Sequence, residues 1–184
     1  MSTREFTGDR FIPGQGGAMI AYEHLHRYAF AARWAQGKRV LDVATGSGWG
    51  AGLLARQASS LWAVDIDFPS LQAAAGQYGY ANILFLHADG VRLPVRDASV
   101  DLVVAFEVLE HVRDQEGLVK ELARVASPGG LVLISTPDKA AYSDARGYTN
   151  PFHVSEFYRD DFLELLNAHF RSVRLFRQQV RAGL

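Results

Sequence analysis

Short apolar segments alternate with segments of helical periodicity along most of this chain. The strands predicted from this pattern are 39–43, 61–64, 83–86, 101–106 and 131–135. Parallel strands need a crossover connection, usually a helix, so the alternation favours a parallel sheet. The stretch VDLVVAF at 100–106 is apolar on both faces, which is typical of a strand that helices cover on both sides. We therefore predict a doubly wound α/β fold with a mainly parallel sheet.

Helices are predicted between and beside these strands. Their ranges are 21–37, 50–58, 68–77, 115–126 and 156–168. Asp67 and Asp114 precede two of them and are expected to cap the helix N-termini. A sixth strand is expected at about 172–180. With 184 residues, and roughly 100–200 residues per domain, we expect a single domain, in which 1–37 forms a lead-in with one helix and 38–184 forms the core.

A glycine-rich loop follows the first predicted strand, in the segment VLDVATGSGWG at 40–50. Gly46, Gly48 and Gly50 allow a sharp turn and let a ligand approach main-chain N–H groups at the start of a helix. The spacing also satisfies the dinucleotide pattern GxGxxG/A. A nicotinamide cofactor, and a tight turn without any ligand, are therefore both open at this point.

Three aspartates end three successive predicted strands. Asp42 lies four residues before the first glycine of the pattern, where a carboxylate would repel a pyrophosphate but attract an ammonium group such as that of S-adenosylmethionine. Asp65, 23 residues later, can accept both hydroxyls of a ribose. Asp89 can accept an adenine amino group, while the N–H of Gly90 is offered to a ring nitrogen. The set favours an adenosine-containing ligand.

Composition removes several classes of function. The formal net charge of −1 gives no global electrostatic attraction for a nucleic acid. The absence of cysteine removes disulfides, thiol catalysis and cysteine-ligated zinc, and no HExxH or paired-acid pattern is present, so we predict no metal. No apolar run approaches the roughly 18 residues of a membrane span, and the N-terminus holds no secretory signal. These features predict a soluble, cytoplasmic protein with no membrane partner.

The ordered motifs resemble those of class I S-adenosylmethionine-dependent methyltransferases, in particular the small-molecule, type 11-like group. The segment 40–50 resembles the first motif of that family, 93–112 resembles the block in which the fourth strand runs into a Leu-Glu-His turn, and 124–137 resembles the Pro-Gly-Gly entry into the fifth strand. Ala44 stands where the family usually has glycine, and alanine fits there if its φ is negative. The resemblance implies a Rossmann-like methyltransferase fold, with S-adenosylmethionine as cofactor and S-adenosylhomocysteine as product.

The resemblance also implies a set of cofactor-binding residues. They are Tyr22, Arg27, Asp42, Ala44, Gly46, Gly48, Asp65, Ile66, Asp89, Gly90, Phe106, Glu107 and His111. Phe106 and Glu107 would lie beneath the reactive sulfonium. The helix at 21–37 would form a lid over the cofactor, with Tyr22 and Arg27 facing inward.

The same resemblance implies an enzyme that transfers a methyl group in line to a small molecule or a carbohydrate. The segment NPFHVSEF at 150–157 resembles methyltransferases found beside carbohydrate-biosynthesis enzymes. A hydroxyl acceptor needs a general base near neutral pH, and the candidates are Glu107, His111 and His153. Two alternatives stay open: a noncatalytic S-adenosylmethionine-binding protein and, from the glycine pattern alone, a nicotinamide-dependent oxidoreductase.

The sheet of this family has a seventh, antiparallel strand that follows the sixth. After a sixth strand at about 172–180 only 181–184 remain, which is too short for a turn and a strand. We therefore expect the sheet to lack its last strand. The chain is then shortened at that end, or another segment or subunit covers the open edge, which would allow an oligomer.

Overall fold

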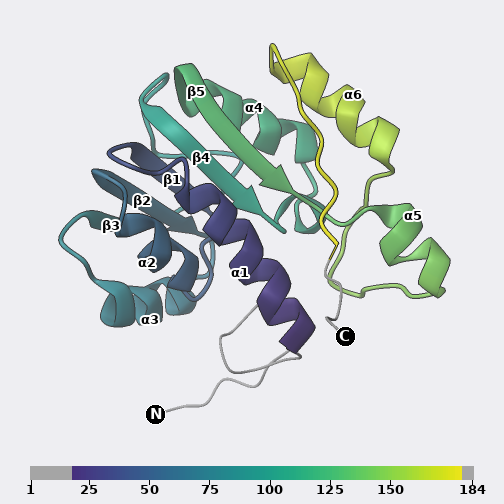
Figure 1. Ribbon diagram of the computed structural model, residues 1–184, viewed down its shortest axis with the longest axis horizontal. Coiled ribbons are helices and arrows are strands. Elements are labelled where there is room, and N and C mark those ends of the chain that lie inside the picture. The colour runs from purple at the N-terminus through teal and green to yellow at the C-terminus, as the bar shows by residue number, and fades with distance from the viewer. Residues whose placement is uncertain (1–17, 180–184) are drawn as a thin grey trace.

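A five-stranded sheet runs through the centre of the structure, a computed structural model in which residues 18–179 are described (Figure 1). Its strands are β1 (Arg39–Val43), β2 (Ser60–Asp65), β3 (Ile83–His87), β4 (Val100–Phe106) and β5 (Ala126–Ser135). They lie in the order β3-β2-β1-β4-β5, and every neighbouring pair is parallel. The five strands predicted first along the chain are therefore confirmed.

Helices cover both faces of the sheet. They are α1 (Ala18–Ala32), α2 (Trp49–Ala55), α3 (Phe68–Tyr78), α4 (Gln115–Val125), α5 (Lys139–Tyr142) and α6 (Arg159–His169), with 3₁₀ turns η1 (Leu109–His111) and η2 (Asp144–Arg146). On one face, α1 and α2 bury an apolar cluster that includes Tyr28 and Leu54. On the other face, α4 and α6 bury a second cluster that includes Leu118 and Phe162. These two cores confirm the doubly wound α/β fold.

The strand order reverses beside β1. The chain passes from β1 to β2 and β3 on one side, and then returns to β4 and β5 on the other side. In open α/β sheets, ligands bind at such a point, outside the carboxyl ends of the strands. The register pairs Val43 of β1 with Ala105 of β4, so the loops that follow these two strands start from the same edge. The fold thus points to this edge as the place for a site.

The termini and lengths of the helices follow from local sequence. The Asp67 carboxylate accepts a hydrogen bond from the Ser70 N–H at 3.1 Å, and the Asp114 carboxylate accepts one from the Gly117 N–H at 2.8 Å. Each bond satisfies an N–H that has no partner within its helix, so both predicted caps are confirmed. None of the described helices is both long and apolar enough to cross a membrane.

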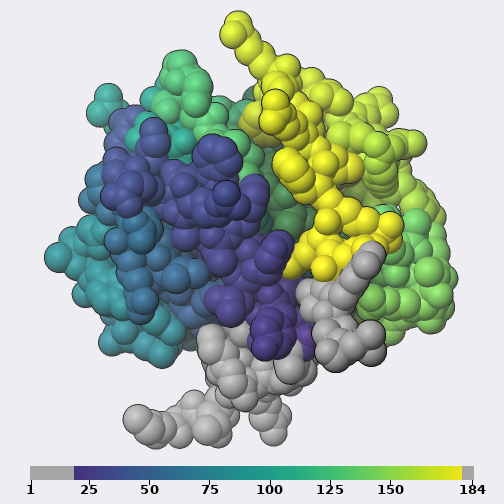
Figure 2. All heavy atoms as spheres, viewed as in Figure 1, coloured from purple at the N-terminus to yellow at the C-terminus, as the bar shows by residue number. Residues whose placement is uncertain are grey.

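The sixth predicted strand is wrong within the described residues. The segment 172–179 pairs with no strand and lies beside α1 instead (Figure 2). The Gln178 amide donates to the Glu23 carbonyl oxygen at 2.9 Å, and the Gln178 side-chain oxygen accepts a hydrogen bond from the Arg27 guanidinium at 2.8 Å. Side-chain bonds to a helix thus take the place of a strand ladder, and β5 is the edge of the sheet that the described residues form.

Several boundaries also differ from the predictions, and two short helices were not predicted. The first helix ends at Ala32 rather than at residue 37. β5 begins at Ala126, because the Pro-Gly-Gly segment continues along β4 through a register shift between Val100 and Leu102. The short helices α5 and η2 were not predicted, since their few residues give no clear periodicity.

Gly50→Ala tests the packing that joins α1 to α2. A Cβ at position 50 would lie 2.2 Å from two carbon atoms of the Tyr28 ring, so the ring must move. We expect urea denaturation to show a loss of about 1–3 kcal/mol in the free energy of unfolding, the usual cost of overpacking. Gly76→Ala in α3 is the matched control, because a Cβ there meets nothing within 4 Å. It should instead gain about 0.5–1 kcal/mol from helix propensity, and equal effects of the two substitutions would contradict the packing described.

Candidate functional site

Asp42 is the central polar group near the carboxyl end of β1. Its carboxyl group is buried and accepts hydrogen bonds from the Tyr28 hydroxyl at 3.0 Å and from the Thr45 hydroxyl at 2.7 Å. Burial raises the pKa of Asp42 to about 7, because removal from water disfavours the charged form. The two hydroxyl donors oppose that rise. Helix α1, the glycine-rich loop and the sheet therefore meet at this one carboxyl group.

Asp65 fastens the glycine-rich loop to the end of β2. Its carboxylate accepts hydrogen bonds from the Gly46 N–H at 2.7 Å and from the Asp67 N–H at 2.8 Å. Gly46 and Gly48 have φ angles of +56° and +77°, in the left-handed region that a residue without a Cβ adopts freely. The loop therefore makes the sharp turn that its glycines predict, and it places Asp65 beside its main-chain N–H groups.

Ala44 does not have the negative φ on which its fit to the loop was predicted. Its φ is +58°, a conformation that costs a residue with a Cβ roughly 1–2 kcal/mol. The neighbouring loop bonds hold it there: the Thr45 N–H donates to the Val64 carbonyl oxygen at 3.0 Å, and the Gly48 N–H donates to the Thr45 carbonyl oxygen at 3.0 Å. Ala44, which stands where glycine is usual, therefore has a strained backbone conformation.

The third acid lies on the loop after β3. Asp89 is exposed and is followed by the partly buried Gly90. The Ala88 N–H donates to the Asp65 carbonyl oxygen at 3.1 Å, which joins the ends of β2 and β3. Ile66, next to Asp65, is 66% exposed. The structure thus brings the residues predicted to hold ribose and adenine to one open edge.

Glu107 follows β4 in a strained conformation, with a φ of +51°. Its N–H donates to the Ser135 carbonyl oxygen at 3.0 Å, and its carboxylate accepts a hydrogen bond from the Ser135 hydroxyl at 2.6 Å. Strain of this kind persists where the surroundings fix it and is common at functional sites. The preceding residue, Phe106, packs edge-on against the ring of Tyr28, with 5.2 Å between ring centroids. The end of β4 therefore adjoins the residues around Asp42.

Of the two residues expected to face inward from α1, Arg27 packs against the end of β4, whereas Tyr22 lies on an exposed part of the helix. The Arg27 guanidinium lies 3.7 Å from the Glu107 carboxylate, and its side chain is 13% exposed. Its buried Nε has no hydrogen-bond partner among the described residues. Tyr22 is 64% exposed. The reason is geometric, because five residues turn a helix by about 500° and so separate the two side chains by about 140° around α1.

A second buried acid, Glu110, lies in η1 beyond the end of β4. Its side chain is 1% exposed and accepts a hydrogen bond from the Thr136 hydroxyl at 3.0 Å. Burial, and next the charge of Glu107, raise the pKa of Glu110 to about 8. Its Oε1 lies 4.0 Å from Nε2 of the neighbouring His111. A carboxyl group and an imidazole are thus placed together at the same edge of the sheet as Asp42.

The histidines predicted as catalytic candidates meet across a long stretch of sequence. The rings of His111 and His153 pack edge-on, with 5.0 Å between their centroids. Nδ1 of His153 lies 2.5 Å from the Glu156 carboxylate, whose other oxygen accepts a hydrogen bond from the Ser143 hydroxyl at 2.5 Å. Glu107, the third candidate, lies near these residues, and its negative charge helps to raise the pKa of Glu110.

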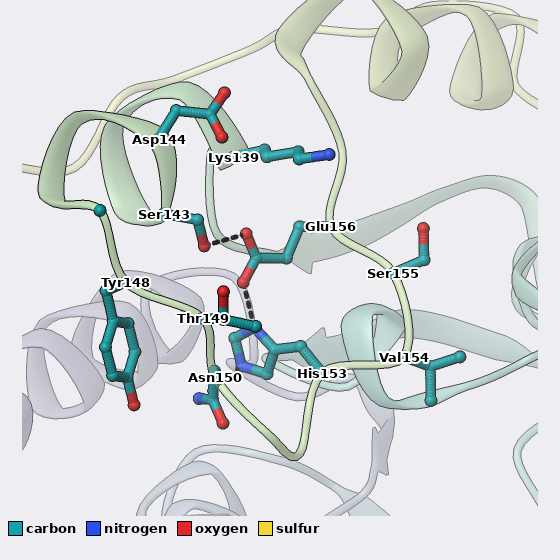
Figure 3. Close-up of a pocket in the computed structure, with 11 residues that line it drawn as sticks. Lys139, Ser143, Asp144, Tyr148, Thr149, Asn150, His153, Val154, Ser155 and Glu156 are labelled. Carbon is teal, nitrogen blue, oxygen red and sulfur yellow. Dashed lines mark hydrogen bonds and ion pairs between the residues drawn. The ribbon is translucent and has the colours of Figure 1, made fainter.

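A polar pocket of about 470 Å³ opens beside His153 (Figure 3). Its lining is rich in hydroxyl, amide and carboxyl groups, from Ser143, Asp144, Thr149, Asn150, Ser155 and Glu156. In Figure 3 the Glu156 carboxylate lies between Ser143 and His153, and dashed lines mark its two bonds. The pocket is therefore suited to a small ligand with several hydrogen-bonding groups.

Sequence reasoning did not single out several residues that complete the site. They are Tyr28, Thr45, Glu110, Ser135, Thr136, Asn150 and Glu156. Tyr28 belongs to the first predicted helix, where a tyrosine is readily taken for a core residue. Glu110 is the middle residue of the Leu-Glu-His turn, so that motif carried a signal that was assigned to His111 alone. Only the i, i+3 spacing of His153 and Glu156 could have indicated that these two side chains pair.

Comparisons with known proteins identify the family of this chain. A family model described as a methyltransferase domain matches residues 41–134. A probable S-adenosylmethionine-dependent methyltransferase of Mycolicibacterium smegmatis is 36% identical over 90% of this chain. Another from Mycobacterium tuberculosis, Rv3030, is 36% identical over 87% of it. The chain spans 64% and 58% of the lengths of these two relatives.

Solved structures show the same fold. The YcgJ protein from Bacillus subtilis superposes with a TM-score of 0.71 at 23% identity, over 79% of this chain and 68% of that one. The N-methyltransferase NodS from Bradyrhizobium japonicum, in complex with S-adenosylhomocysteine, superposes with a TM-score of 0.69 at 16% identity, over 84% and 76% of the two chains. At these identities the likeness concerns the fold alone.

Asp42→Asn tests how burial of this carboxyl group links stability to pH. The pKa of the Asp42 carboxyl group is about 7 in the folded protein, against an ordinary value of 3.8. The protonated carboxyl group therefore makes its full contribution to stability below about pH 3.8, and this contribution is lost as the pH rises to about 7. The asparagine stays neutral, so its stability relative to the wild type should rise across that range by on the order of 2–4 kcal/mol. Urea denaturation at several pH values measures this difference. Asp160→Asn, at an 88% exposed carboxylate, should follow the wild type, and a parallel profile for Asp42→Asn would contradict the burial described.

Ala44→Gly tests the strain in the loop. Glycine relieves about 1–2 kcal/mol of left-handed strain but adds about 0.5–1 kcal/mol of chain entropy to the unfolded state. We therefore expect a net gain of about 0.5–1 kcal/mol in the free energy of unfolding, measured by urea denaturation. Ala73→Gly, at an exposed position in α3, is the control and should lose about 1 kcal/mol. A loss at both positions would show that Ala44 is not strained.

Proposed function

This chain belongs to the class I S-adenosylmethionine-dependent methyltransferases, and we propose that it transfers the methyl group of S-adenosylmethionine to a hydroxyl of a small molecule or a carbohydrate. The methyltransferase domain model matches residues 41–134. One observation carries the proposal. Carboxylates follow one another at the ends of three neighbouring parallel strands, from Asp42 in β1 through Asp65 in β2 to Asp89 after β3. Such a row matches the ammonium, ribose and adenine groups of one extended ligand.

The side chains at these strand ends suit that cofactor. Asp42 is buried between two hydroxyl donors, and an ammonium group beside it would supply the positive charge that favours its carboxylate form. Each oxygen of Asp65 accepts one N–H and keeps a lone pair for a ribose hydroxyl. The exposed carboxylate of Asp89 can accept an amino group. When bound, the cofactor supplies a methyl group already attached to a good leaving group.

The chain's own residues then have to align the acceptor and exclude water. Tyr28 and Phe106 form an aromatic contact between α1 and the end of β4, next to the strained Glu107. Arg27 covers Glu107 from α1. We expect the acceptor oxygen to approach from the histidine side, where the polar pocket lies.

The composition of the pocket supports a hydroxyl-rich acceptor. Its hydroxyl, amide and carboxyl groups can both donate and accept hydrogen bonds, as the hydroxyls of a sugar require. His153 belongs both to the pocket and to the contact with His111, so the pocket joins the strand-end site directly. A small, polar acceptor bound there would lie beside His153, one of the three candidates for handling its proton.

Asp65→Asn tests the cofactor site by isothermal titration with S-adenosylhomocysteine. The wild-type chain should bind it, and the variant should bind about 10–100-fold more weakly, because a hydrogen bond to a charged group contributes about 1.5–3 kcal/mol. Asp160→Asn removes an exposed carboxylate on α6 and should leave the affinity unchanged. A wild-type chain that does not bind S-adenosylhomocysteine would refute the proposal.

Transfer itself is measured with radiolabelled S-adenosylmethionine and a panel of sugars and phenols. Label in a sugar hydroxyl would support the acceptor class proposed here. Tight cofactor binding without transfer to any acceptor would favour the noncatalytic alternative over catalysis. Transfer to a nitrogen or sulfur acceptor would keep the cofactor site and overturn the choice of a hydroxyl.

A further inference from the structure

We propose that Glu110, His111 and His153 bind a divalent transition-metal ion of the Zn²⁺ or Co²⁺ class. One donor atom from each of the three side chains lies within 4.8 Å of the other two. Bonds of about 2.0–2.2 Å in tetrahedral geometry place donor atoms about 3.3–3.6 Å apart, so the cluster has to contract by up to about 1.5 Å to bind an ion. Two imidazoles and one carboxylate are a ligand set of catalytic zinc sites and of non-haem iron sites. This site replaces the sequence-based expectation of no metal.

Both imidazole rings are already oriented as metal ligands usually are. Nδ1 of His111 lies 2.9 Å from the Phe152 carbonyl oxygen, an acceptor that places the ring proton on Nδ1. Nδ1 of His153 lies 2.5 Å from the Glu156 carboxylate, which has the same effect. In both rings Nε2 then carries the lone pair, and Nε2 of His111 lies 4.0 Å from Oε1 of Glu110. An Nδ1–H bound to a carbonyl or carboxylate is the arrangement that accompanies most histidine ligands.

The backbone holds the two ligand-bearing segments together. The N–H groups of Val154 and Ser155 both donate to the Glu110 carbonyl oxygen, at 2.7 and 3.4 Å. The Gln115 side chain donates to the carbonyl oxygens of Leu109 and Ser155, each at 3.0 Å. The loop that carries His153 is therefore fixed to the turn that carries the other two ligands. Such preorganisation lowers the entropic cost of gathering ligands around an ion.

The charges around the cluster favour a cation. Glu110 is almost completely buried near a second acid, Glu107, and a cation bound at the cluster would offset the negative charge of the two acids. Arg27 pairs with Glu107 at 3.7 Å and offsets one of these two charges. The ion replaces a hydrogen bond of 3.0 Å that Nε2 of His153 makes with the Asn150 amide.

The role of the ion rests on the proposed function. An ion with three protein ligands keeps positions for water or an acceptor, and His153 also lines the polar pocket (Figure 3). A bound ion would lower the pKa of an acceptor hydroxyl beside it, and the proton would then pass to a water molecule. The acceptor oxygen then forms a bond to the methyl carbon, while the carbon–sulfur bond breaks and its electron pair returns to sulfur. The histidines thus act on the acceptor through the metal rather than as bases.

The test is metal binding by the full chain without tags, stripped with a chelator and titrated with no cofactor present. Titration with Co²⁺, followed by its visible absorption, and with Zn²⁺, followed by calorimetry, should show one ion per chain. His153→Ala and His111→Ala should each weaken binding by about 100-fold or more, since each removes a ligand. Glu156→Gln keeps all three ligands but should weaken binding by about 10–100-fold, because it loosens the orientation of His153. Circular dichroism checks that each variant folds.

His26→Ala is the matched control, because His26 is an exposed histidine on α1 outside the cluster. It should bind the ions as the wild type does. The absence of a one-to-one complex, or equal affinities in His153→Ala and His26→Ala, would overturn the metal site.

The stripped chain should still bind S-adenosylhomocysteine, so the two proposals can fail separately. Metal binding without cofactor binding would refute the proposed function and leave the metal site standing. Cofactor binding without metal binding would refute the metal site alone.

Discussion

Burial of the Asp42 carboxyl group determines the arrangement around the carboxyl ends of the strands. A polar group removed from water is costly unless it is hydrogen-bonded, so Asp42 needs its partners. Tyr28 supplies one bond and thereby fixes α1 on the sheet, and Thr45 supplies the other and fixes the glycine-rich loop. Gly50 completes the arrangement, since a Cβ there would collide with the Tyr28 ring. Helix, loop and strand are thus positioned together by one acid.

A second buried acid plays the corresponding part on the other side of the point where the strand order reverses. Glu110 follows β4, and its main-chain carbonyl and side chain bind two further segments, at 154–155 and at Thr136. The two acids therefore organise different surroundings. Those of Asp42 are the glycine-rich loop and the strand ends toward β3, whereas those of Glu110 are the histidines and the polar pocket. The division suits the proposed methyl transfer, in which a cofactor and an acceptor have to lie in line.

The features that could be predicted from the sequence are those that depend on residues close together in the chain, within one strand, the loop after it and the next helix. Period-two and helical patterns, the capping role of Asp67 and the acids at strand ends all belong to this class. What it missed depends on contacts between distant segments, such as the approach of His153 to Glu110. The segment 172–179 illustrates the limit, because alternation indicates an extended chain without indicating its neighbour. Here the neighbour is the side of α1, through Gln178, and no strand of the described sheet.

Neighbouring residues of α1 contact several distant parts of the structure. Arg27 binds Glu107 at 3.7 Å and Gln178 at 2.8 Å, while the next residue, Tyr28, reaches Asp42. Adjacent residues on a helix point about 100° apart, so one turn of α1 contacts the ends of two strands and the segment 172–179 at once. Because these bonds come from neighbouring residues, movement of α1 away from the sheet breaks them together. The contacts of Arg27 and Tyr28 thus join Glu107 and Asp42 to the same turn of α1.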